Sequence, residues 1–174
     1  MRKLVIAFAV TMIAVGSANA SLTEYTSRTA WEAAVTSFLT ESFDDATLNA
    51  GITATAGDAA GGVVTDNLDP YYQMWWDIVD DDPAQETVFN FDPDIYAWGG
   101  DWDLVNPGGP GLGISVYIDG SIVGSAPTVD RETTGFYGIV STVAFDEVRL
   151  GSGEQVGEIE TYTLDDMVLS LIHI

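Results

Sequence analysis

Two groups of carboxylates, far apart in the sequence, have the clearest potential for chemistry. Asp44 and Asp45 lie near the start of the chain, and Asp165 and Asp166 lie near its end. Neighbouring carboxylates repel each other unless a cation lies between them, and Ca²⁺ binds about six to eight oxygen ligands without Cys or His. If the first and last strands are neighbours, Asp44, Asp165 and Asp166 are expected to hold a structural calcium ion. The alternative is that Asp44 and Asp45 form a turn, while Asp165 and Asp166 lie at an exposed sheet edge.

An aromatic run over residues 71–76 forms a second candidate site. Read as a strand, it places Tyr71 and Trp75 on one face and Tyr72 and Trp76 on the other. If the second face is core, Tyr71 and Trp75 are displayed to solvent. Exposed flat rings can bind ligands with apolar faces, sugars included. The alternative is a strand that is buried on both faces or covered by a loop.

Several classes of chemistry lack the residues that they need. The chain of 174 residues has no Cys, and its one His, His173, lies in a terminal segment. A Ser-His-Asp triad, a thiol nucleophile and a thiolate zinc site are therefore excluded from the rest of the chain. The 27 Asp and Glu residues outnumber five Lys and Arg, and the net charge of −22 excludes nucleic-acid binding by counterion release. A carboxylate pair could still hydrolyse glycosides.

The densest acidic segment spans residues 77–82 and includes Asp77, Asp80, Asp81 and Asp82. It lacks the spacing and the central Gly of an EF-hand loop. We therefore expect a solvated loop that favours solubility and repels anionic surfaces, rather than a second ion site.

Both ends of the chain are expected to lie outside the folded domain. Residues 1–20 combine a positively charged start, an apolar run too short for a typical membrane span, and small residues before Ser21, which predicts a cleaved signal peptide. Residues 169–174 match the in-frame translation of a transposase adapter used to build sequencing libraries, although an ordinary apolar strand end would read the same way. These features predict one domain over residues 21–168, with any sorting signal beyond Val168 lost.

One short helix is predicted near the start of this domain. Thr29 and Glu32 have the spacing of a capping box, in which each side chain satisfies a backbone N–H group near the other. Trp31, Val35 and Phe38 recur at helical spacing and would form one apolar stripe. We therefore expect one short helix, with a capping box at Thr29 and an apolar stripe along one side.

The rest of the domain has the period of β-strands. Over residues 114–118 apolar and polar side chains alternate, and Asp119 and Gly120 then predict a type I′ turn into a return strand over residues 121–126. Further strands are predicted over residues 87–91, 95–99, 136–140, 145–150 and 161–168. The expected core includes Ile114, Val116, Ile118, Val148, Leu150, Tyr162 and Leu164, with Trp98 and Trp102 as further core or corner residues. This pattern predicts an all-β fold, a jelly-roll-type β-sandwich with one short N-terminal α-helix.

The chain resembles exported bacterial proteins that carry a C-terminal PEP-CTERM sorting signal and are processed by an exosortase. The segments that carry the resemblance are the helix over 27–38, the Phe43-Asp44 pair, residues 98–102, the strand pair 135–140 and 145–150, and the strand 164–168. The Pro-Glu-Pro signal itself is not in the sequence. The resemblance implies a surface protein linked to extracellular polysaccharide. The paired acids also resemble those of carbohydrate-binding jelly rolls, which implies a structural Ca²⁺.

We therefore expect an exported, non-enzymatic protein of the cell surface or extracellular matrix, with carbohydrate and calcium as its ligands. Its expected partner is extracellular polysaccharide, with no nucleic acid, and with a membrane contacted only through a lost C-terminal signal. One alternative is a glycan-active hydrolase that uses two carboxylates flanking a groove at Trp75. A second alternative is a purely structural coat domain, which a fully buried pair of Trp75 and Trp76 would favour.

Overall fold

The computed structural model describes residues 20–80, 82–105, 109–153 and 158–172. Nearly all of the predicted signal peptide, together with Asp81 and His173, lies outside the described residues. Within them, the elements in chain order are β1 Leu22–Tyr25, α1 Arg28–Ala34, β2 Leu39–Glu41, β3 Ile52–Thr55, β4 Gly62–Val63, β5 Trp75–Val79, the 3₁₀ turn Pro83–Gln85, β6 Thr87–Asp103, β7 Leu112–Ile118, β8 Ser121–Ser125, β9 Thr134–Ser152 and β10 Glu160–Ser170.

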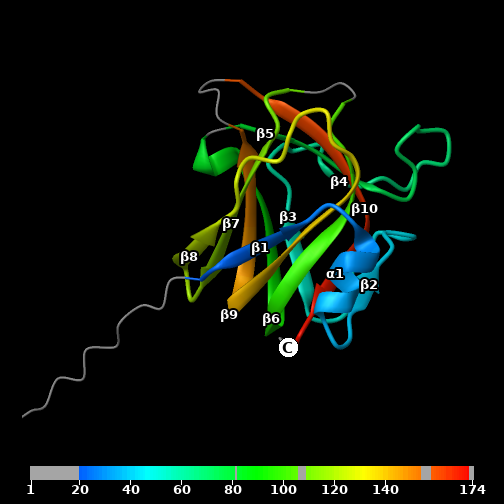
Figure 1. Ribbon diagram of the computed structural model, residues 1–174. Helices are drawn as coiled ribbons and strands as arrows, with labels where there is room; N and C mark the ends of the chain where they lie inside the picture. The colour runs from blue at the N-terminus through cyan, green and yellow to red at the C-terminus, as the bar shows by residue number, and fades with distance from the viewer. Residues whose placement is uncertain (1–19, 81, 106–108, 154–157, 173–174) are drawn as a thin grey trace, which may run out of the picture.

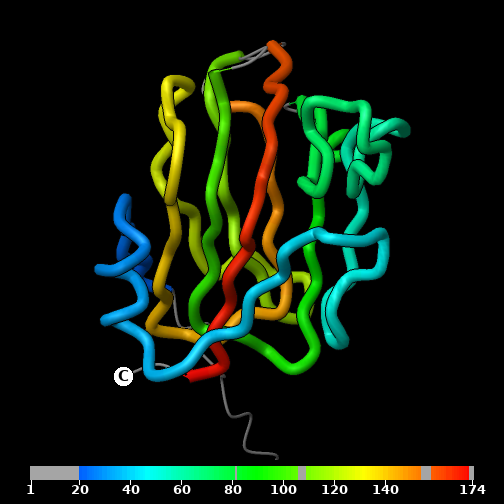
Figure 2. The backbone as a smooth tube through the Cα atoms, turned by 90° about the vertical axis from the view of Figure 1, so that its right-hand side faces the viewer, coloured from blue at the N-terminus to red at the C-terminus, as the bar shows by residue number. Residues whose placement is uncertain are grey.

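The strands form one antiparallel sheet that folds over on itself (Figure 1). Its order is β4-β5-β10-β6-β9-β7-β8, with β1 added to β9, β2 to β10 and β3 to β6. Figure 2 shows the long strands running side by side through the molecule, with α1 on the outside. The structure confirms the prediction of an all-β sandwich with one short N-terminal helix.

Two long strands, β6 and β9, join the two halves of the sandwich. Their pairing continues from Thr87 opposite Leu150 to Asp103 opposite Thr134, and its register shifts around Ile95. The sequence predicted each of these strands as two separate ones. In β6 the turn residues Asp92, Pro93 and Asp94 interrupt the pattern, whereas β9 continues through the gap left between its two predicted strands. The bend brings Phe89, from the first part of β6, against Trp98 from its second part, with ring centroids 6.1 Å apart. The core therefore lies between two halves of a continuous sheet.

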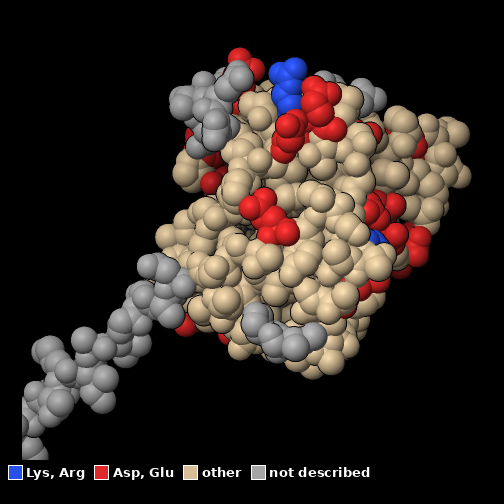
Figure 3. Space-filling model, in the orientation of Figure 1, with Lys and Arg blue, Asp and Glu red and all other residues tan. Residues whose placement is uncertain are grey.

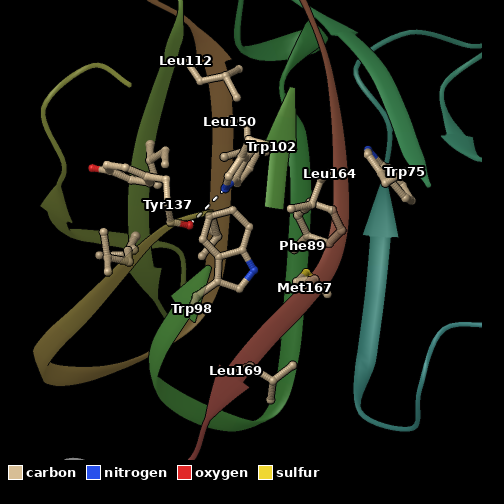
Figure 4. Close-up of a cluster of buried hydrophobic side chains, with 14 of the residues drawn as sticks. Trp75, Phe89, Trp98, Trp102, Leu112, Tyr137, Leu150, Leu164, Met167 and Leu169 are labelled. Atoms are coloured by element: carbon tan, nitrogen blue, oxygen red, sulfur yellow. Dashed lines mark hydrogen bonds between the residues drawn. The ribbon is translucent and has the colours of Figure 1, made fainter. Parts of the chain in front are cut away.

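The predicted core is confirmed. Ile114, Val116, Val148, Leu150, Tyr162 and Leu164 are all at most 1% exposed, and Ile118 is partly buried against them. Aromatic rings form a connected series through this core: Figure 4 shows Trp75, Phe89, Trp98 and Trp102, and Tyr162 continues the series, with neighbouring centroids 5.0 to 6.1 Å apart. The Trp102 Nε1 donates to the carbonyl of Tyr137 at 3.0 Å, so this buried polar atom is satisfied.

The predicted hairpin is also confirmed. β7 and β8 are joined by Asp119 and Gly120, whose φ angles are +49° and +72°. A type I′ turn needs positive φ at both central positions, which Gly adopts freely and Asp tolerates.

Helix α1 packs on the outer face of the sheet. Its N-cap is Ser27, whose Oγ accepts from Ala30 N at 3.4 Å, so the predicted capping box at Thr29 is wrong. The capping pattern fails because Ser27, two residues earlier, already has an extended backbone and a suitable hydroxyl. Trp31 is fully buried in a second apolar cluster with Val35, Ala97, Val140 and Val168.

The last strand runs past the expected domain boundary at Val168. Leu169 is 4% exposed and pairs with Leu39 on one side and Trp98 on the other. The Ser170 hydroxyl donates to the carbonyl of Ser37 at 2.5 Å. In the described part of the chain, therefore, the first two residues of segment 169–174 belong to the sheet, whatever their origin.

Candidate functional site

The aromatic run does not have the strand phase that the sequence predicted. β5 begins only at Trp75, and the residues before it form a turn in which Gln73 has a φ of +63°. Trp75 is 4% exposed and packs against Phe89, with centroids 5.0 Å apart, and against Phe43 at 6.3 Å. This corrects the expectation that Trp75 is displayed: Trp75 is a core residue, because the turn shifts the alternation along the chain.

The ring that lies beside Tyr71 is Trp76. The two rings are nearly parallel, with an interplanar angle of 18° and centroids 6.4 Å apart, and both are partly exposed. They line a hollow of about 390 Å³, together with Asp66, Asp69 and the segment over residues 60–65. The candidate ligand site therefore contains Tyr71 and, in place of Trp75, its neighbour Trp76.

Local backbone pairing positions this hollow. β4 pairs with β5, so that Gly62 lies opposite Trp76, and the pairing continues where Val64 exchanges hydrogen bonds of 2.9 and 2.8 Å with Met74 and Gln73. The connection between β4 and β5 then projects from the sandwich (Figures 1 and 2). Asp66 and Asp69 shape it, since their Oδ1 atoms accept from Leu68 N at 3.0 Å and Tyr71 N at 2.9 Å. A rigid strand and a turn-rich loop therefore form the two walls.

A second feature is an acidic cluster at the bulge in β10, which we define as Asp44, Asp101, Asp165 and Asp166. The register of β10 against β6 shifts after Asp165, and Asp166 has a φ of +44°. Asp44 approaches from the loop after β2, where it accepts from the Ser42 hydroxyl at 2.8 Å and from Gln73 Nε2 at 3.0 Å. The structure therefore brings the three acids predicted from the sequence to one region and adds Asp101.

The pKa of Asp165 reflects its burial first and the neighbouring acids second. Burial raises this pKa; the Asp166 N–H group, bonded to Oδ1 at 2.7 Å, lowers it, and the charges of Asp166, Asp101 and Asp44 raise it further. Arg28 offsets part of this charge. Its Nη2 donates to Asp101 Oδ2 at 3.0 Å and to the carbonyl of Asp166 at 2.8 Å. In Figure 3, acidic side chains surround a basic one at the right-hand edge, beside α1.

This arrangement differs from a calcium cage. Among the described residues, no group of three or more acidic or His side chains has the geometry to hold a metal ion. Hydroxyl, amide and guanidinium groups already donate to oxygens of Asp44, Asp101 and Asp166. Calcium binding by Asp44, Asp165 and Asp166 stays a prediction, and an ion would have to displace these donors. Sequence reasoning missed Arg28, although it is one of only three basic residues after residue 20.

Asp77 was expected in a solvated loop, and this expectation is wrong. Asp77 lies in β5, is fully buried, and accepts from the N–H groups of Gly57, Asp58 and Ile78 at 2.7, 3.0 and 2.8 Å. The Thr87 hydroxyl is bonded to Asp77 and lies 2.6 Å from the hydroxyl of Tyr162. The strand alternation that buries Trp75 also buries Asp77, two residues on. These bonds give Asp77 a structural role, anchoring the loop over residues 56–58.

Replacement of Asp165 by asparagine is expected to stabilise the protein at neutral pH. The raised pKa means that the folded state favours the protonated carboxyl, so its stabilising contribution is present at low pH and is lost as pH rises through the folded-state pKa. The asparagine side chain keeps the Oδ1 acceptor and removes the charge. Relief of like-charge repulsion of about 0.5–1 kcal/mol raises Tm by about 1–4 °C, which calorimetry measures.

The gain in Tm should shrink as pH falls through the folded-state pKa of Asp165, because the wild-type carboxyl is then protonated as well. The matched control is Asp45→Asn, an exposed residue whose Oδ1 likewise accepts a local N–H, from Thr47 at 2.7 Å. A variant at position 165 that melts below the wild type at neutral pH would contradict the prediction.

Comparisons with known proteins identify no relative of the chain. No family model, no curated protein and no solved structure matches it. No helix in the part of the chain that the structure describes is long and apolar enough to cross a membrane. A fold alone does not define a function, so a function has to be inferred from the hollow at Tyr71 and Trp76 and from the acidic cluster.

Proposed function

We propose that the chain is an exported, non-enzymatic protein of the cell surface or extracellular matrix, and that it binds carbohydrate in the hollow at Tyr71 and Trp76. The single observation that carries the proposal is the pair of nearly parallel, partly exposed rings in a hollow of about 390 Å³. A sugar ring presents apolar C–H faces that pack on aromatic rings, while its hydroxyls need polar partners such as Asp66 and Asp69. The signal-like N-terminus supports export.

The positions of the acids with a raised pKa favour binding over hydrolysis. A glycosidase needs a general acid whose pKa is raised, beside a second carboxylate. Burial raises the pKa of Glu86, Glu160 and Asp165. None of these three lines the hollow, whose acids are Asp66 and Asp69. The hollow therefore has features of a binding site rather than of a hydrolytic one.

The hollow also bears on the purely structural alternative. A coat domain without a ligand was expected to bury both Trp75 and Trp76, but only Trp75 lies in the core. Trp76 keeps part of its surface accessible beside Tyr71. Large aromatic surface that is left accessible in a concavity favours a ligand.

The test is polysaccharide binding by variants of the two rings that line the hollow. Tyr71→Ala and Trp76→Ala should each weaken binding to a soluble polysaccharide by about two- to tenfold, because one ring contact contributes about 0.5–1.5 kcal/mol. Tyr72→Ala is the matched control, since Tyr72 is the adjacent aromatic residue, is 39% exposed and is not among the residues that line the hollow. Affinity electrophoresis through a panel of neutral, acidic and amino polysaccharides gives the measurement, with Tm as the check on folding.

Two outcomes would overturn the proposal. One is a wild-type protein that no polysaccharide of the panel retards. The other is an equal loss of binding in Tyr72→Ala and Tyr71→Ala, which would place the contact outside the hollow.

A further inference from the structure

The geometry points to the class of sugar: we infer that the hollow at Tyr71 and Trp76 takes an amino-sugar glycan with free, positively charged amines. This inference rests on the proposed carbohydrate function and specifies its ligand. It starts from the charges that line the hollow. Asp66, Asp69 and Tyr71 line it from the loop and Trp76 from β5, and no Lys or Arg is among the lining residues.

Each part of the hollow favours an ammonium group. A protonated amine can form ion pairs with Asp66 and Asp69, while the faces of Tyr71 and Trp76 attract cations through the ring quadrupole. The Oδ1 atom of each Asp is bonded to a backbone N–H group two residues on. These bonds hold the carboxylates in place before a ligand arrives, which lowers the ordering cost of binding.

Acidic glycans are disfavoured because no described basic group is left to receive them. Arg28 pairs with Asp101 at 3.0 Å, Arg131 with Glu132 at 3.3 Å, and Arg149 with Glu147 at 2.6 Å. The other Arg and Lys residues of the chain, Arg2 and Lys3, precede the described region. A uronic acid or sulfated sugar would therefore meet carboxylates without a compensating cation.

The charge of the whole chain acts in the same direction. A net charge of −22 draws a cationic polymer toward the surface and repels an anionic one, most strongly at low ionic strength. The aromatic hollow would then decide where along the surface the sugar binds. Charge alone would attract any polycation, so the inference requires that the rings distinguish a sugar from a simple cationic peptide.

The test uses the whole protein and four soluble probes in isothermal titration calorimetry at mildly acidic pH. The probes are a glucosamine oligomer, an N-acetylglucosamine oligomer, a glucuronate oligomer and a lysine oligomer. We expect the glucosamine oligomer to bind about tenfold more tightly than the N-acetylglucosamine oligomer, a ratio that corresponds to about 1.4 kcal/mol and is within reach of two exposed ion pairs. Added salt should reduce this advantage.

Variants separate the hollow from the general charge. The double variant Asp66→Asn with Asp69→Asn keeps both Oδ1 acceptors and should bring the glucosamine affinity down to that of the N-acetyl form. Its matched control removes the same charge elsewhere: Asp119→Asn in the β7–β8 turn with Glu158→Gln, both exposed. The control should keep the tenfold preference, and equal losses in the two double variants would overturn the inference.

The probes distinguish failure of the inference from failure of the proposed function. Equal binding of the two glucosamine forms, or tighter binding of the lysine or glucuronate oligomer, would reject the amino-sugar inference. If a neutral sugar still bound and Tyr71→Ala still weakened it, the carbohydrate function would stand. If no sugar probe bound at all, both would be rejected.

Discussion

Replacement of Asp77 by alanine is expected to lower the free energy of unfolding by about 3–5 kcal/mol, a large effect for a single side chain. The Asp77 carboxylate accepts from three backbone N–H groups and from the Thr87 hydroxyl in a fully buried position. Alanine would leave these donors without their acceptor, and each buried unsatisfied donor costs about 1–3 kcal/mol before water or local relaxation recovers part of it.

Urea denaturation followed by tryptophan fluorescence measures this loss. Asp77→Asn should lose less stability than Asp77→Ala, because its amide keeps one acceptor oxygen. Some stability should still be lost, since the amide NH₂ group would face other donors. Glu158→Ala is the control for removing one acidic residue, since Glu158 is exposed, and it should change stability by less than about 0.5 kcal/mol. A loss below about 1 kcal/mol for Asp77→Ala would show that the network is not structural.

The second large effect is expected at Trp31, the residue that fastens α1 to the sheet. Trp31 is fully buried and donates from Nε1 to the carbonyl of Ile139 at 3.1 Å. A Cβ atom at Gly138 would lie only 3.0 Å from the Trp31 ring, so the indole packs directly on the backbone of β9. Trp31→Ala should therefore cost about 3–5 kcal/mol, through lost burial and the cavity that remains.

Two further variants make the Trp31 measurement specific. Trp31→Phe keeps much of the apolar contact and loses the hydrogen bond, so its cost should be intermediate. Phe38→Ala removes a ring that meets Trp31 edge-on at 5.9 Å but is 40% exposed, and its cost should stay near about 1 kcal/mol. Denaturant midpoints of the three variants give the order, and a Trp31→Ala protein as stable as Phe38→Ala would contradict the proposed anchoring role of Trp31.

Features set by neighbours in the chain were predictable from the sequence. The Asp119-Gly120 turn needs only two residues that accept positive φ. The buried phase of Ile114, Val116 and Val148 follows from alternation along single strands. In both cases the physical cause acts over a few residues, so a short stretch of sequence contains it. The predicted helical stripe is only partly confirmed: Trp31 is buried on α1, but the helix ends at Ala34, Val35 has an extended backbone and Phe38 is 40% exposed.

Features set by distant contacts were decided only by the tertiary structure. Gln73 adopts a positive φ where its backbone pairs with Val64, just after β4, and β5 therefore starts only at Trp75. From there Trp75 and Asp77 face the core, and Trp76 stays accessible. Asp44, Asp101 and Asp165 share a region because β10 lies between β2 and β6. Arg28 reaches them only because α1 packs on that face. A local pattern records residue types and spacing, but burial and charge balance depend on which segments the folded sheet brings together.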